Sequence, residues 1–279
     1  MAKTSVFILA PDFPALDGCE MLSGAFSTTL PIAKRLGYDG VEIVMGDPAE
    51  FDAGEFKDLL REHGLSISAI NSGGIQYKLK AALVDADARK AEQALEKLKH
   101  NIRHCHALDC LQQVGVARGF AVKGRPMRWY RDCLVEVLKE AVSYASALNV
   151  PVVLEYTNRF EINTINTGAE AREIVDRVGH SNLGILIDTG HSFLEDPDVY
   201  QNIDDLKDYV RHFHLHDSNG GAALIGGGEI DFNRVMERCS QIGYQGWFSD
   251  GLFTAKYSQD ELHRSTGGLR GLYQKHGLS

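Results

Sequence analysis

The sequence predicts a (β/α)8 barrel, and three features support this fold class. Short apolar runs rich in β-branched and aromatic residues alternate with longer segments of helical periodicity, eight of each. Repeated βα units imply parallel strands joined by right-handed crossovers. A chain of 279 residues has the length of one such barrel. We therefore expect a single barrel domain over residues 1–279. A doubly wound open sheet is the alternative, although no Gly-rich phosphate turn follows the first expected strand.

The first four units each pair an apolar run with a helical pattern. Pro31 lies in the first turn of its helix, where the missing N–H costs little, and Gly64 ends the second helix. Leu98, Ile102 and Cys105 recur at helical spacing and indicate a buried stripe on the third helix. The expected strands span residues 5–9, 40–44, 66–70 and 111–116, and the helices that follow them span residues 29–36, 51–63, 87–108 and 130–148.

The last four units repeat the pattern with clearer helix signals. Thr167 and Glu170 form a Thr-x-x-Glu capping box, and Gly179 ends the same helix. The run "LGILID" is apolar up to its final carboxylate, as expected of a strand buried on both faces. The expected strands span residues 150–155, 183–188, 212–216 and 246–249, and the helices span residues 167–178, 202–210, 232–242 and 258–276.

The composition excludes several classes of protein. The chain is 44% apolar and 24% charged, with a net charge of −9 and no block of Lys or Arg. A nucleic-acid surface needs clustered positive charge, so none is expected. No apolar stretch approaches the roughly 20 residues of a membrane span, and the N-terminal apolar run is interpreted as a strand instead of a signal peptide. We therefore expect neither nucleic acid nor membrane as a partner.

The five cysteines indicate a reducing compartment. Their number is odd and no CxxC occurs, so a disulfide framework is not expected and a cytoplasmic location fits best. The segment "HCHALDC" at residues 104–110 resembles a metal cluster. Cys105, however, belongs to the buried helical stripe, and His104 and His106 flank it on diverging sides. We interpret the segment as part of a helix.

Polar side chains gather where the later strands end. Glu155 ends one strand and Asp188 the next, and the run "HFHLHD" then alternates three histidines with apolar residues. Barrel active sites lie at the carboxyl ends of the strands. Carboxylates and an imidazole converging there predict a divalent-metal site, with Mn²⁺ the preferred ion and Mg²⁺, Co²⁺ or Zn²⁺ as alternatives. His214 is the expected imidazole ligand, because His212 should lie deeper in the barrel and His216 beyond the rim, toward the substrate or a loop.

The chain resembles the xylose isomerase-like barrel superfamily of sugar isomerases, epimerases and dehydratases, in particular the branch that contains D-tagatose 3-epimerase. The segments "LEYTNRFE", "IDTGH", "HFHLHD" and "GGGEIDF" carry the resemblance. It implies that Glu155 is both a metal ligand and an acid/base, and that Glu161 touches the substrate. It implies Asp188 and His214 as further ligands and His191 as a substrate-binding residue. A homo-oligomer is expected on the resemblance alone.

Two positions depart from the family pattern. In the family, an Arg six residues after the metal-binding His binds the sugar, and the corresponding residue here is Gly220. The family's last strand ends in a Glu, and the corresponding residue here is Gly251. In a regular strand Asp250 would point into the helix layer, a poor place for a carboxylate. Because Gly251 permits a bulge or an early strand end, we expect Asp250 to turn inward. It would then be a fourth ligand, directly or through a water, and a second acid/base weaker than Glu155.

The resemblance implies proton abstraction next to a carbonyl of a sugar or polyol-derived substrate, through an enediolate. Proton return to the opposite face gives an epimer, and return to the neighbouring carbon gives an isomer. The alternatives are a one-base dehydratase or lyase of the same superfamily and a non-catalytic or partner-dependent relative. A DNA-repair role like that of endonuclease IV, which shares the fold, requires extra histidines after the third and fourth strands. The chain has "INSGG" and "GVARG" there.

Two further residues stand out. Glu42, within an expected strand, is either a site residue or a structural hydrogen-bond partner in the barrel. Arg118, after the fourth strand, is a candidate to line the pocket.

Overall fold

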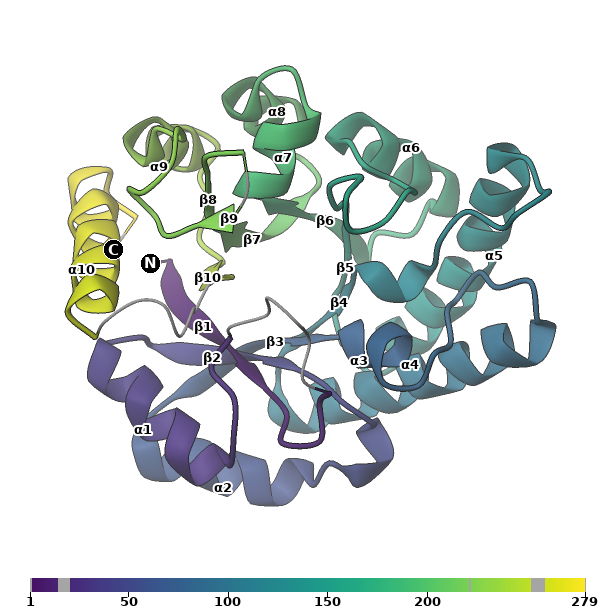
Figure 1. The fold of residues 1–279 in the computed structure, drawn as a ribbon, viewed down its shortest axis with the longest axis horizontal. Helices are drawn as coiled ribbons and strands as arrows, with labels where there is room; N and C mark the ends of the chain where they lie inside the picture. Colours follow the sequence, from purple (N-terminus) through teal and green to yellow (C-terminus); the bar gives the residue numbers. More distant parts are fainter. Residues whose placement is uncertain (1, 15–20, 221, 252–258, 279) are drawn as a thin grey trace.

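A closed barrel of eight parallel strands forms the centre of the molecule, with helices around it (Figure 1). The computed structural model describes residues 2–14, 21–220, 222–251 and 259–278. The strand order around the barrel is β1-β10-β7-β6-β5-β4-β3-β2. The strands are β1 (Lys3–Leu9), β2 (Gly40–Val44), β3 (Ser66–Asn71), β4 (Leu111–Val114), β5 (Val152–Glu155), β6 (Leu183–Asp188), β7 (Val210–Leu215) and β10 (Trp247–Asp250). The predicted fold class is confirmed.

The outer helices begin and end largely at the predicted signals. The Thr167–Glu170 capping box is present in both directions, and Gly64 and Gly179 end their helices in the left-handed conformation. The helices between the strands are α1 (Phe26–Leu36), α2 (Ala53–His63), α4 (Ala88–Leu108), α5 (Met127–Ala147), α6 (Gly168–Val178), α8 (Val199–Asp205), α9 (Phe232–Gln241) and α10 (Gln259–Lys275). The predicted start of the last helix, residue 258, lies outside the described residues.

Strand alternation divides the buried side chains into two layers. Phe213 and Phe248 face outward, where their rings lie 5.4 Å apart and Phe248 stacks on Tyr273 of α10. Burying such rings contributes about 1.5–3 kcal/mol each. The alternate positions face inward and are polar: the Ser249 hydroxyl lies 2.6 Å from that of Ser5 and 3.0 Å from Nε2 of His212. The apolar core therefore lies mainly between strands and helices, while hydrogen bonds fill much of the barrel interior.

Several short elements were not predicted. They are two one- to two-turn helices at strand ends, two 3-10 turns and a small antiparallel hairpin: α3 (Gly73–Tyr77), α7 (Thr189–Glu195), η1 (Pro48–Glu50), η2 (Val116–Arg118), β8 (Asp217–Ser218) and β9 (Ala222–Ala223). Segments of two to seven residues are too short to show a hydrophobic period. The helix α7 matters most for the site, because it begins immediately after Asp188 and carries His191.

The histidines beside Cys105 diverge as predicted. His104 contacts the carbonyl of Pro48 and His106 that of Leu148, whereas Cys105 is buried on α4. Free thiols are found at Cys105, Cys110, Cys133 and Cys239, and Cys19 lies outside the described residues. Across the described part of the chain, no helix combines the length and apolarity needed to cross a bilayer.

Candidate active site at the strand ends

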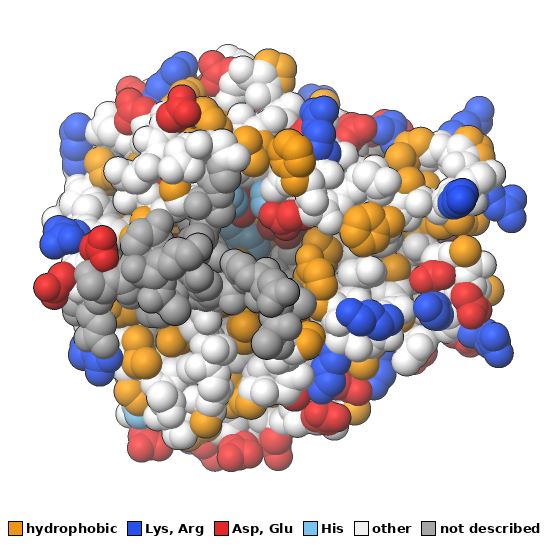
Figure 2. Space-filling model, viewed as in Figure 1, with side chains coloured by type: hydrophobic (Ala, Val, Ile, Leu, Met, Phe, Trp, Pro, Cys, Tyr) orange, Lys and Arg blue, Asp and Glu red, His pale blue; other side chains and the backbone are white. Residues whose placement is uncertain are grey.

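Glu155, Asp188 and His214 meet at the carboxyl ends of β5, β6 and β7. Each offers a ligand atom within 4.8 Å of those of the other two. Register explains the meeting: Asp188 pairs with His214 across β6 and β7, so both side chains project to the same inner side of the barrel. All three are buried. Histidine and acidic side chains lie in a hollow near the middle of this face (Figure 2).

Glu155 is held by a glutamine on the neighbouring strand. The Nε2 group of Gln113 donates to Glu155 Oε2, and Gln113 Oε1 accepts from the backbone N–H of Ser72 at 3.2 Å. That second bond fixes which end of the amide faces the carboxylate. The other oxygen, Glu155 Oε1, lies 2.9 Å from Nδ1 of His214. Sequence reasoning missed Gln113, although two consecutive glutamines in an apolar strand were an available signal.

His214 lies between two carboxylates. Its Nδ1 faces Glu155, and its Nε2 lies 3.0 Å from Glu42 Oε1. Burial by itself would lower the pKa of His214, but Glu42 and Glu155 together raise this pKa well above its ordinary value. The opposite effect holds for Glu42: burial would raise its pKa, and His214 and His212 outweigh burial and lower it. The predicted depth order is confirmed for His212, which lies deeper, against Glu42 and Ser249.

Asp188 both ends β6 and caps α7. Its Oδ1 accepts from the backbone N–H of His191 at 3.0 Å, as N-cap aspartates do. The same oxygen lies 2.9 Å from Nδ1 of His216. Burial would raise the pKa of Asp188, but His191 and His216 outweigh it and lower this pKa. Burial would lower the pKa of His216, and the Asp188 carboxylate raises it overall.

The ring of His216 requires a glycine beneath it. A Cβ on Gly190 would lie 1.9 Å from Nε2 of His216, which no side chain could tolerate without displacing the ring. His216 is 7% exposed, and its ring lies edge-on to that of His191. The Thr-Gly between Asp188 and His191 therefore provides the space that this imidazole occupies at the rim.

The hydrogen-bond network assigns the proton of His191. Asn158 Oδ1 accepts from the backbone N–H groups of Phe160 and Glu161, so its NH₂ group must donate. That group lies 2.9 Å from Nδ1 of His191 and 3.0 Å from Glu161 Oε1. His191 therefore carries its proton on Nε2, which lies 3.9 Å from both Glu161 Oε1 and Asp188 Oδ2. It presents a hydrogen-bond donor beside the other site residues.

In the described part of the chain, three side-chain groups have the composition and spacing of a cation site: Glu42–His212–His214, Asp188–His191–His216 and Glu155–Asp188–His214. Both oxygens of Glu42 accept hydrogen bonds in a sealed layer where Glu42 and His212 are 0% exposed. In the second group Asn158 holds Nδ1 of His191, so this imidazole presents an N–H donor and not a lone pair. The third group offers two carboxylates and one imidazole at the hollow, a donor set that suits Mn²⁺, Co²⁺ or Zn²⁺.

Asp250 does not join this group, and the prediction that it turns inward is wrong. β10 continues regularly to Asp250, which pairs with Leu215 of β7 and Val6 of β1 on the outward side. Its Oδ2 accepts a hydrogen bond of 2.7 Å from the Tyr38 hydroxyl, behind the barrel wall. Burial and then the Asp250 charge raise the pKa of Tyr38 well above its ordinary value. The Tyr38 hydroxyl is the hydrogen-bond partner that a buried carboxylate needs in this outward position.

Arg118 braces the loop after β5 and does not line the hollow. It is 0% exposed, and its guanidinium donates to the carbonyl oxygens of Glu155, Thr164 and Ile165 at 2.7–3.1 Å. These bonds join the two ends of the loop that carries Asn158 and Glu161. Arg118 therefore fixes the loop that carries these two site residues without facing the hollow itself.

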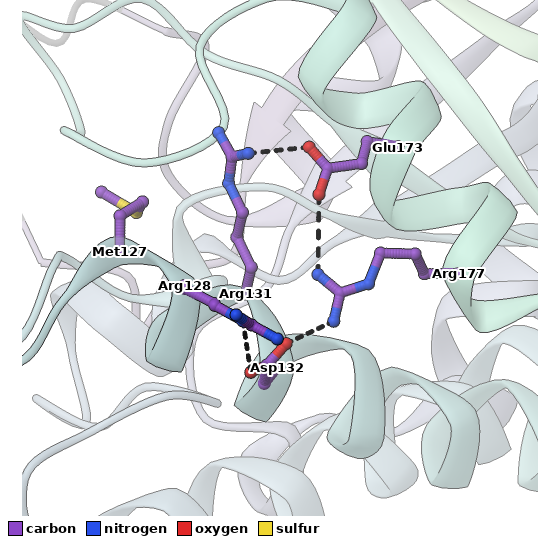
Figure 3. A pocket seen from close by; sticks show the side chains of 6 residues that line it. All are labelled: Met127, Arg128, Arg131, Asp132, Glu173 and Arg177. Atoms are coloured by element: carbon purple, nitrogen blue, oxygen red, sulfur yellow. Dashed lines mark hydrogen bonds and ion pairs between the residues drawn. The ribbon is translucent and has the colours of Figure 1, made fainter.

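A second hollow lies on the outer ring, between α5 and α6 (Figure 3). Ion pairs line it: Arg131 contacts Glu173 at 2.7 Å, and Arg177 contacts Asp132 at 2.5 Å and Glu173 at 3.6 Å. These arginines have acidic partners on α5 and α6, so we interpret the charged side chains of this hollow as contacts between the two helices and not as a binding site.

Comparison with known proteins agrees with the barrel fold. The family model for the xylose isomerase-like TIM barrel matches residues 30–269. A ketose 3-epimerase of Arthrobacter globiformis is 30% identical over 249 residues, covering 86% of this chain and 82% of the relative. An L-ribulose 3-epimerase of Methylomonas sp. is 28% identical over 244 residues, covering 86% and 83%. A solved L-ribulose 3-epimerase superposes with a TM-score of 0.81 at 22% identity, covering 99% of this chain and 96% of that one.

Proposed function

The chain belongs to the xylose isomerase-like TIM-barrel family, and we propose that it is a divalent-metal-dependent sugar epimerase. The observation that carries the proposal is the meeting of Glu155, Asp188 and His214 within 4.8 Å at the strand ends. The similarity to ketose 3-epimerases supports a small sugar or sugar derivative as the substrate. The proposed reaction is proton transfer at a carbon next to a carbonyl.

Glu155, Asp188 and His214 would hold the cation. A bound divalent cation, with Mn²⁺ the preferred ion, supplies a Lewis acid that makes the proton next to a carbonyl easier to remove. The donor set agrees with this assignment, because carboxylate oxygens and one imidazole suit Mn²⁺ and its neighbours. The hydrogen bond from Gln113 holds Glu155 in the orientation that the site requires.

Glu155 would remove the proton, since its carboxylate faces the hollow and is fixed by Gln113. The Nε2–H of His191 would donate a hydrogen bond to a substrate hydroxyl, and Asn158 keeps that proton on Nε2. Glu161, whose side chain is 47% exposed beside His191, would accept from another hydroxyl. His216 would contact the substrate at the rim.

The position of Asp250 favours a second candidate reaction. Inverting a carbon by deprotonation requires a proton donor on the opposite face of the substrate. Asp250 does not occupy that place, because it accepts a hydrogen bond from Tyr38 on the helix side of the barrel. A single base at Glu155 is sufficient for an aldose–ketose isomerase or for a β-eliminating dehydratase or lyase. These one-base reactions share their first step with the epimerase.

The test is to incubate Mn²⁺-loaded protein with a panel of ketoses in D₂O and to follow the α-protons by NMR. Exchange is expected with at least one sugar, and a Glu155→Gln variant should lose it. Glu161→Gln is the matched control: it should raise KM and retain exchange. Exchange with an epimer as product identifies the epimerase, and exchange with an isomer or a dehydrated product identifies the alternative. If no sugar exchanges in the wild-type protein, the proposed function is wrong.

A further inference from the structure

Glu42 is a carboxylate sealed inside the barrel, one layer below the proposed metal site. It lies in the middle of β2 and is 0% exposed. Its Oε1 lies 3.0 Å from Nε2 of His214. Its Oε2 lies 2.9 Å from Nε2 of His212 and 2.7 Å from the Ser249 hydroxyl. An ionised carboxylate that is fully buried needs such partners, and three are supplied from β7 and β10.

These contacts assign the protons of the two imidazoles. A carboxylate accepts hydrogen bonds and does not donate them, so His212, His214 and Ser249 must each be the donor. The proton of His214 that faces Glu42 is therefore on Nε2. The other nitrogen, Nδ1, faces Glu155 at 2.9 Å and Asp188 at 3.9 Å, on the side of the proposed cation. By the same rule Nδ1 carries a proton toward Glu155 when no cation is bound. A cation would displace this proton, because Glu42 holds the proton on Nε2, and the lone pair of Nδ1 would then face the cation.

We propose that Glu42 is a positioning residue for the metal site. It selects Nδ1 of His214 as the ligand atom, fixes the plane of that ring and places a negative charge behind it. Metal-bound histidines commonly donate their second N–H to a carboxylate in this way, and the donor bond increases the basicity of the ligand nitrogen. The proposal rests on the proposed function only in that a cation must bind at Glu155, Asp188 and His214. It does not depend on which sugar reacts.

A purely structural role for Glu42 must be separated from this one, because Glu42 also accepts from His212 and Ser249. Ser249→Ala provides the matched control. It removes one of the two donors to Oε2, in the same buried layer, and leaves the bond between Oε1 and His214 in place. Loss of packing or of a buried hydrogen bond should affect both variants, whereas loss of metal affinity should follow Glu42 alone.

The experiment measures the Mn²⁺ affinity of the wild type, Glu42→Gln and Ser249→Ala by competition with a chelator, and the melting temperature of each protein without metal. Glu42→Gln should bind Mn²⁺ 10–100-fold more weakly. Ser249→Ala should stay within about 3-fold of the wild type, as expected for a site whose ligands and their partners are unchanged. Equal affinities for the wild type and Glu42→Gln, or equal losses in both variants, would overturn the proposal.

A second measurement needs no variant. In the Zn²⁺-loaded wild type with ¹⁵N-labelled histidine, His214 should show a protonated Nε2 and a metal-bound Nδ1. A metal-bound Nε2 would overturn the proposal, whether or not Glu42→Gln folds. The two proposals fail separately: a wild type that binds no divalent cation contradicts the metal dependence of the proposed function, whereas tight binding that is unaffected in Glu42→Gln contradicts only the role of Glu42.

Discussion

Asp188 and Asp250 are both carboxylates at the ends of barrel strands, and they are equally buried, at 3% and 4% exposure. Asp188 pairs with His214 and faces the barrel interior, where it meets two further imidazoles. Asp250 pairs with Leu215, one residue further along β7, and accepts a hydrogen bond from Tyr38 on the helix side. A shift of one residue along a strand therefore separates a candidate metal ligand from a structural hydrogen-bond acceptor.

The comparison shows that residue type and burial do not decide the role of a strand-end carboxylate. In a pleated strand, neighbouring side chains point to opposite faces, so the register decides. Asp250 joins the end of β10 to Tyr38, which follows α1, and so connects the barrel to its helical ring. Asp188 instead faces imidazoles that keep its pKa low, as a cation ligand requires.

The largest effect on metal binding should come from Asp188→Asn, and the same substitution at Asp250 is its matched control. Asp188→Asn should weaken Mn²⁺ binding by more than about 100-fold, since losing a ligand exceeds the effect of losing its outer partner. Turnover should fall in parallel. Asn remains a good N-cap, so α7 should persist. Chelator competition and far-UV circular dichroism measure the two effects.

Asp250→Asn should keep full metal content, because the carboxylate lies on the helix side of the barrel wall. Its amide oxygen can still accept from Tyr38. A metal loss in Asp250→Asn comparable to that in Asp188→Asn would contradict the distinction between the two strand ends.

The pH dependence of metal binding should be set by His214, which faces the barrel interior. Glu42 and Glu155 raise the pKa of His214 well above its ordinary value, so a cation must displace a proton from this imidazole below that raised pKa. Apparent affinity should then rise about tenfold per pH unit, for one displaced proton, and level off above the pKa of His214. Asp188 contributes nothing here, since its lowered pKa keeps it ionised. Titration calorimetry between pH 6 and 9 in several buffers would reveal the proton release, and a flat profile would contradict it.

The smallest effect should come from removing the hydrogen bond between Tyr38 and Asp250, on the helix side of the barrel. Tyr38→Phe removes the hydroxyl that donates to Asp250 and should lower the free energy of unfolding by about 1–2 kcal/mol. Metal affinity should not change. Urea denaturation measures the first quantity and chelator competition the second. A variant that keeps full stability but binds metal weakly would reverse the assignment of Asp250.

The sequence alone was sufficient for the barrel and for three members of the candidate site. Eight alternations of strand and helix pattern permit few topologies, and parallel strands bring their carboxyl ends to one rim. The sequence therefore predicts that Glu155, Asp188 and His214 lie together, as they do in the structure. Strand alternation places His212 and His214 on one face of β7, and their positions along the strand predicted that His212 lies deeper.

The tertiary structure alone decided the direction of Asp250 and the partners that surround the site. Whether β10 bulges or stays regular depends on its pairing with β1 and β7, and no local pattern records that choice. Glu42 reaches His214 across 172 residues of chain, and Gln113 reaches Glu155 across 42. Such contacts arise from the register and closure of the barrel, which bring together residues that are far apart in the sequence. The residues next to them in the sequence do not indicate which side chains will meet. A periodic pattern determines which face a residue occupies along a strand, whereas only the closed barrel determines what that face meets.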